Sequence, residues 1–177
     1  LQGIDKNTKN FESFKTAIVS LSKETGLEFE KLGKGLLAFT TAGLGAEQAQ
    51  KGLETSAKLA IGTFSDVEEN ARALTDAYLI FGNTLDETIK KEDQLKFISG
   101  LLIKATDPSV TTVSELTQGF ENFGAKAKAV GLSLTQTIAL LSSLANLGIR
   151  GAEGGTALAT AFQKLVENSE EVNFIFA

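Results

Sequence analysis

The chain has 177 residues, of which 42% are hydrophobic and 22% charged, as expected of one globular domain or two small ones. It contains no Cys and no His, which excludes disulfides, thiolate catalysis and zinc–thiolate sites and removes the usual general base near neutral pH. The net charge of −5 argues against direct nucleic-acid binding, which requires a basic surface, and no apolar run approaches the roughly 20 residues that cross a bilayer.

Apolar residues recur at helical spacing along nearly the whole chain, which predicts an all-α fold, a compact bundle of about eight short helices. The segment 1–26 is a leading helix or linker, in which Phe11, Phe14, Ile18 and Leu21 share one face. Seven further helices are predicted over residues 27–42, 46–60, 66–81, 92–105, 113–130, 134–147 and 156–168. The tail 170–177 is apolar from Val172 onward and fits either a strand or a further helix.

Helix boundaries have local signals in the sequence. A hydroxyl residue followed three positions later by Glu or Gln has the spacing of a capping box, which marks a helix start. The pairs with this spacing are Ser65–Glu68, Thr84–Glu87, Thr112–Glu115 and Ser133–Gln136. Glycines that accept left-handed backbone geometry mark predicted helix ends at positions 26, 43, 82, 131 and 148. Pro108 ends the fifth helix, because proline disfavours helical geometry in the residue before it.

An internal echo relates two parts of the chain at a separation of 88 residues. The matches include Gly43 with Gly131, Leu53 with Leu141, and Ala71 with Ala159, and they need no gap. They suggest two related three-helix units, 27–82 and 112–169, joined by the fifth helix within a core module spanning 27–169. Chance agreement between amphipathic helices of similar composition is the alternative. Because the chain lacks Met and begins with Leu, we interpret it as a piece of a longer polypeptide, although a small protein can lack Met by chance.

The glycine-rich stretch 148–156 lies between two predicted helices and allows two interpretations. Free amides at the start of the eighth helix could bind an anion beside Arg150, but no strand precedes them and Glu153 would repel a phosphate. A tight structural corner fits better, because glycines permit a sharp turn and small residues permit close backbone approach. Thr156 is then expected at the N-cap or in the first turn of the eighth helix.

Other chemistry finds little support, and we predict no catalytic residue, no cofactor and no metal site. Gly33-Lys34-Gly35 lacks the first Gly and the hydroxyl residue of a phosphate-binding P-loop. The acidic residues of 86–93 lack the spacing of a calcium loop, and the other carboxylates are interleaved with lysines as on a solvated surface.

The stretch "VGLSLTQTIALLSSLANLGIRGAEGGTALATAFQKL" resembles the signature region of phage tail tape-measure proteins, in their phage minor tail core domain. The resemblance is specific over about 104–165 and diffuse over 27–103. One position departs from the family, which usually carries Ala where this chain has Gly154; the departure makes the turn looser. The residues that carry the corner and the signature are Gly131, Ser133, Gly148, Ile149, Gly151, Gly154, Gly155, Thr156 and Leu158.

The resemblance implies a structural role in the tail of a bacteriophage or of a prophage-derived particle, a virion tail that is assembled in the bacterial host cytoplasm. In this tail the protein would set tail length and leave ahead of the DNA. It also implies partners: other tape-measure copies, tail-tip or baseplate proteins, tube proteins and tail assembly chaperones. No direct nucleic-acid binding is expected, and membrane contact is left to other parts of the parent chain.

The residues themselves set a limit on this role. A molecular ruler requires a long continuous helix, whereas this chain has signals that end a helix about every 15 residues and lacks sustained heptads. We therefore expect a compact module that docks or anchors the ruler. The alternatives are a helical adaptor that binds peptide or protein partners, an enzyme built on carboxylates, and a membrane-active segment with interfacial helices.

Overall fold

The computed structural model describes residues 8–86, 88–91, 93–106 and 111–175, and these residues form eight α-helices, one 3-10 turn and no strand. The predicted all-α fold is therefore confirmed. The helices are α1 (Thr8–Thr25), α2 (Phe29–Thr41), α3 (Ala46–Thr63), α4 (Val67–Phe81), α5 (Gln94–Ala105), α6 (Val113–Ala129), α7 (Leu134–Asn146) and α8 (Gly151–Ile175), with the 3-10 turn η1 at Gly82–Thr84.

Several helix ends follow from the signals in the sequence. Thr112 and Ser133 form complete capping boxes with Glu115 and Gln136, and so start α6 and α7 as predicted. Glycines 26, 43, 131 and 148 adopt positive φ angles, which end α1, α2, α6 and α7. The backbone therefore turns where residues without a β-carbon make the turn inexpensive.

Three boundary predictions were wrong in detail. Asp66, not Ser65, caps α4, because its carboxylate accepts hydrogen bonds from the amides of Glu68 and Glu69. Gly82 has a φ of −53° and continues the chain into η1 instead of adopting the left-handed conformation. Thr84 closes that turn and starts no helix, and its proposed partner, residue 87, lies outside the described residues.

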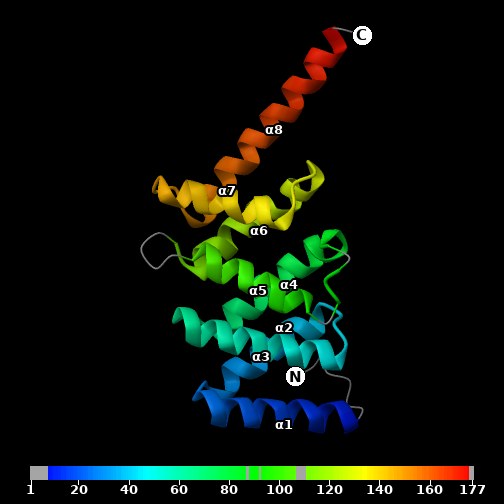
Figure 1. Ribbon diagram of the computed structural model, residues 1–177, viewed down its shortest axis with the longest axis vertical. Coiled ribbons are helices and arrows are strands. Elements are labelled where there is room, and N and C mark those ends of the chain that lie inside the picture. The colour runs from blue at the N-terminus through cyan, green and yellow to red at the C-terminus, as the bar shows by residue number, and fades with distance from the viewer. Residues whose placement is uncertain (1–7, 87, 92, 107–110, 176–177) are drawn as a thin grey trace.

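The helices stack in chain order, with α1 at one end and α8 at the other (Figure 1). Every extensive contact between them joins helices that are one or two places apart along the chain. Each helix packs on the next helix in the chain and also on the one after it, for example α4 on α6 and α3 on α5. This arrangement is that of α-solenoids. The last part of α8 extends beyond the stack, which also assigns the tail up to residue 175 to a helix.

A continuous apolar core runs through this stack from α1 to α8. Its largest fully buried side chains include Phe39, Phe81 and Phe123, one in each of α2, α4 and α6. The even-numbered helices therefore bear the bulkiest part of the core, and the glycines on them decide how closely neighbouring helices approach.

Candidate functional site

The corner between α7 and α8 is shorter than the glycine pattern suggested. Leu147 follows the last residue of α7, Gly148 has a φ of +88°, and the amide of Ile149 donates to the Leu144 carbonyl at 3.0 Å. This bond closes a Schellman motif, the usual end of a helix at a left-handed glycine. The Nε of Arg150 donates to the Ala145 carbonyl at 3.4 Å, which ties the residue before α8 to the end of α7.

The other residues of the glycine-rich stretch belong to α8, so the predicted start of this helix at Thr156 was wrong. The helix begins at Gly151, and Gly154, Gly155 and Thr156 lie within its first two turns. Low helix propensity made a loop the natural expectation for so many glycines, but propensity is a weak signal that packing overrides. Here the packing partner is α6, against which the start of α8 is pressed.

The crossing of α6 and α8 is a contact between two backbones. A Cβ atom on Gly155 would lie 2.2 Å from the carbonyl oxygen of Gly119 in α6. A Cβ on Gly119 would in turn lie 2.8 Å from Leu141 Cδ2 and 3.1 Å from the carbonyl oxygen of Gly151. A side chain at Gly155 would require displacement of a helix, whereas one at Gly119 would require Leu141 to move aside and the Gly151 carbonyl to shift slightly. Gly119 escaped the sequence analysis, although a glycine inside a strongly helical stretch is itself a signal of close approach.

Polar and aromatic contacts fasten the same crossing along its length. The side-chain amide of Asn122 donates to the Ala152 carbonyl at 3.0 Å and to the Thr156 hydroxyl at 3.2 Å. Further along, the rings of Phe123 and Phe162 lie with their centroids 5.3 Å apart. Thr156 therefore contributes to the contact between the two helices instead of capping α8.

The residues of the predicted signature do not gather in one place. Gly131 and Ser133 form the turn before α7, with a φ of +84° at Gly131, whereas Gly148 and Ile149 form the turn after it. Leu158, on the inner face of α8, is buried in the core. The signature thus covers both ends of α7 and one face of α8, which is a set of packing positions and lacks the convergence of a binding site.

The first half of the stack contains a similar glycine contact. A Cβ on Gly35 of α2 would lie 3.3 Å from Leu53 Cδ1 of α3 and 3.6 Å from the Val67 carbonyl oxygen of α4. Gly119 has the same kinds of neighbour, namely Leu141 of α7 and a first-turn carbonyl of α8. A Cβ added at Gly35 would make only ordinary or slightly tight contacts. The helices that meet at Gly35 are therefore further apart than those that meet at Gly119.

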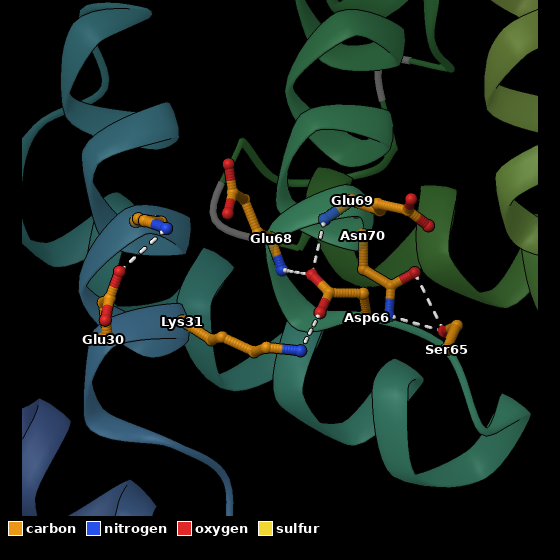
Figure 2. A network of polar contacts seen from close by, with 8 residues as sticks. Glu30, Lys31, Ser65, Asp66, Glu68, Glu69 and Asn70 are labelled. Carbon is orange, nitrogen blue, oxygen red and sulfur yellow. Dashed lines mark hydrogen bonds and ion pairs between the residues drawn. The ribbon is translucent and has the colours of Figure 1, made fainter.

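A polar network joins α2 to the start of α4 on the surface (Figure 2). Lys31 Nζ donates to Asp66 Oδ2 at 2.6 Å, while Asp66 Oδ1 accepts from the amides of Glu68 at 2.8 Å and Glu69 at 3.3 Å. Asn70 is fully buried beside it, and its side chain bonds the hydroxyl of Ser65 at 2.9 Å. One carboxylate therefore caps α4 and holds α2 against it.

Electrostatic surroundings shift the pKa of two carboxyl groups in opposite directions. Burial acts to raise the pKa of Asp66, but the hydrogen bonds from Lys31 and the two amides outweigh it, so the pKa lies below its ordinary value. Burial raises the pKa of Asp76 on α4, and the nearby charge of Glu121 on α6 raises it further, against a smaller opposing effect of Arg72. Asp66 thus stabilises the folded chain as an anion, whereas Asp76 resists ionisation.

The structure offers no candidate for metal chemistry within its described residues, where no group of three or more Asp or Glu side chains could hold an ion. Across the same parts of the chain, no helix is both long and apolar enough to span a membrane. The distinctive features are therefore the helix crossings and the surfaces at the two ends of the stack.

Comparison with known proteins gives two matches. The model of a family described as phage-related minor tail protein matches residues 15–174. The tape measure protein of Pneumococcus phage Dp-1 is 21% identical over 153 residues, which cover 86% of this chain and only 13% of that relative. No solved structure matches the chain.

Proposed function

The chain belongs to the phage-related minor tail protein family, and we propose that it is a compact helical segment of a tape-measure protein that helps to set tail length and docks at the tail tip or in the tube lumen. The family assigns it a structural role in a phage tail. The observation that carries the proposal is the family match, which spans nearly the whole chain from residue 15 to residue 174.

The layered fold supports a docking role over a ruler role for this segment. A helical ruler advances about 1.5 Å per residue along one continuous axis. Here the chain changes direction at each turn (Figure 1), and the longest helix, α8, has 25 residues. The length-setting part of the parent protein would then lie in other segments, since the relative from phage Dp-1 is several times longer than this chain.

The proposed partners follow from the same role. They are other copies of the protein, the tube proteins, the tail tip or baseplate, and tail assembly chaperones that act in the host cytoplasm before the virion tail is complete. The net charge of −5 fits a segment that shares its space with DNA and does not bind it. We propose no catalytic role, because the family is one of structural tail proteins.

The test compares two substitutions in the phage that encodes the chain. Gly155→Leu places a large side chain at the α6–α8 crossing, whereas Ala125→Leu adds a similar volume at an exposed position of α6. We expect virions of normal tail length and number from Ala125→Leu, and missing tails or tails of uncontrolled length from Gly155→Leu. The purified chain with Gly155→Leu is tested separately for folding. If that chain is unfolded and the phage still makes normal tails, the folded module is not required for tail assembly, which would refute the proposal.

A further inference from the structure

We propose that the two ends of this stack are complementary binding faces, through which a second copy of the chain binds head to tail. The first, the groove face, lies between α1 and α2 and includes the exposed rings of Phe11 and Phe29. The second, the α8 face, is formed by Ala157, Ala161 and Leu165 on the outer side of α8. The inference specifies how one partner named in the proposed function, another copy of the protein, would bind; the evidence for it is the packing inside the stack.

The first step is a correspondence between the two halves of the stack. Gly35 and Gly119 make equivalent contacts and lie 84 residues apart. At the same separation α1 corresponds to α5, the start of α2 to α6, and α4 to α8. The sequence echo has a separation of 88 residues, which fits only α3 and α7. The separation changes from 84 to 88 after α2 because α6 is longer than α2, and it returns to 84 at α4 because α7 is shorter than α3. The corresponding apolar pairs are Phe11/Leu95, Phe14/Ile98, Ile18/Leu102, Leu36/Phe120, Ala73/Ala157, Ala77/Ala161 and Phe81/Leu165.

The joint between the two halves shows how such faces pack when both are present. Ala73 and Ala77 of α4 are 5% and 3% exposed, and they face Leu102 of α5 and Phe120 of α6. The space between these side chains is only about 10 Å³. Phe81 completes the contact, with its ring centroid 5.7 Å from that of Phe120. Two alanines and one large apolar residue of an even-numbered helix thus fill the cleft between the next two helices.

The α8 face repeats this pattern, and among the residues that the structure describes none covers it. Ala157 and Ala161, the counterparts of Ala73 and Ala77, are both exposed. Leu165, the counterpart of Phe81, is 62% exposed, whereas Phe81 is fully buried. Small and apolar side chains therefore occupy much of this helix surface, with the charged Glu153 and Lys164 beside them.

The groove face is the matching half at the other end of the stack. Phe29 is 51% exposed, while its counterpart Val113 is 1% exposed inside the joint. Ile18, Gly33 and Leu36 line a groove of about 360 Å³. Their counterparts Leu102, Thr117 and Phe120 line the filled joint. The groove is thus the same cleft without the helix that fills it inside the stack.

Charge favours a second copy as the occupant of the groove. Inside the stack, Asp76 and Glu121 repel each other across the joint. Their counterparts at the ends of the chain are Thr160 and Leu37, which carry no charge. A joint formed between two copies would thus keep the apolar contacts and lack this particular repulsion. The charged residues that line the two faces are of both signs: Lys15, Glu30 and Lys34 at the groove, and Glu153 and Lys164 on α8. Because the two faces differ, the contact is heterologous, and each added copy leaves one groove face and one α8 face open.

The experiment uses sedimentation velocity of the full chain over a range of concentrations, with one variant for each face. Ala161→Arg blocks the α8 face, and Gly33→Arg blocks the groove face at a position where a new Cβ meets nothing within 4 Å. The matched control is Ala125→Arg, at an exposed position of α6 that belongs to neither face. Phe29→Glu serves as a second groove variant, and circular dichroism checks that every variant is folded.

We expect the parent chain and Ala125→Arg to form larger species as the concentration rises, and each blocked variant alone to raise the dissociation constant by about tenfold or more. An equimolar mixture of Ala161→Arg and Gly33→Arg should form a dimer that grows no further, because one intact face of each kind remains. A parent chain that stays monomeric at high concentration would overturn the proposal. So would a groove variant that still dimerises alone, since that would indicate symmetric pairing of two α8 helices.

Discussion

Gly155 of α8 lies so close to Gly119 of α6 that a Cβ atom on Gly155 would stand 2.2 Å from the Gly119 carbonyl oxygen. The obstacle is backbone, which cannot rotate away as a side chain would. We expect Gly155→Ala to lower the free energy of unfolding by about 2–3 kcal/mol, even though the better helix propensity of alanine offsets about 1 kcal/mol. Urea denaturation followed by circular dichroism measures this change.

The matched control is Gly100→Ala in α5, where a Cβ would meet nothing within 4 Å. This substitution brings the helix propensity of alanine without a clash, so we expect the free energy of unfolding to rise by up to about 1 kcal/mol. A Gly155→Ala protein as stable as Gly100→Ala would show that α6 and α8 are not in backbone contact.

The sequence predicted those parts of the fold whose causes are local. Thr112 and Ser133 start helices because their own side chains satisfy the first amides, and Gly131 ends one because its backbone turns easily. The start of α8 could not be predicted in this way. Gly151 and Gly155 are poor helix formers, and only the long-range contact with α6 explains why they are helical.

The end of α3 departs from the rules that applied to the other helix ends. Phe64, which follows the last residue of α3, has a φ of +54°, the only described residue other than glycine with a positive φ, and its side chain is 99% exposed. Left-handed geometry costs such a residue about 1 kcal/mol relative to glycine, so we expect Phe64→Gly to raise the free energy of unfolding by about that amount.

The stability of Phe64→Gly is measured by chemical denaturation, with Phe64→Ala as the control. Alanine removes the exposed ring but keeps the β-carbon that opposes a positive φ, so we expect this variant to match the parent. Equal stabilisation by both substitutions would assign the effect to the ring and contradict the strain at the end of α3.

Asp66 makes part of the stability depend on pH. The pKa of Asp66 is lower in the folded chain than in the unfolded chain, where it is about 4. The contribution of Asp66 to the free energy of unfolding is therefore fully present above that unfolded-state pKa and is lost as the pH falls through the folded-state pKa. We expect Asp66→Asn, which keeps a capping oxygen but loses the ion pair with Lys31, to show a shallower loss of stability on acidification. Denaturation at a series of pH values tests this, and an unchanged slope would contradict the role of the carboxylate.

Asp76 has the opposite effect on the pH dependence of stability. Because burial and the charge of Glu121 raise its folded-state pKa, ionisation of Asp76 destabilises the folded chain above that pKa. We expect Asp76→Asn to raise the free energy of unfolding at pH 7 by less than about 1 kcal/mol, since partial exposure screens the repulsion. The gain should vanish below about pH 4, where aspartate is protonated in both states; a gain independent of pH would contradict the electrostatic cause.

Small-angle X-ray scattering, extrapolated to zero concentration to remove association between copies, tests the layered stack most directly. For the single chain we predict a radius of gyration of about 20 Å, above the roughly 16 Å of a spherical domain of this length because α8 extends from the stack. A maximum dimension approaching the roughly 270 Å of one continuous helix would instead show that the chain is part of the extended ruler, and would contradict the folded module.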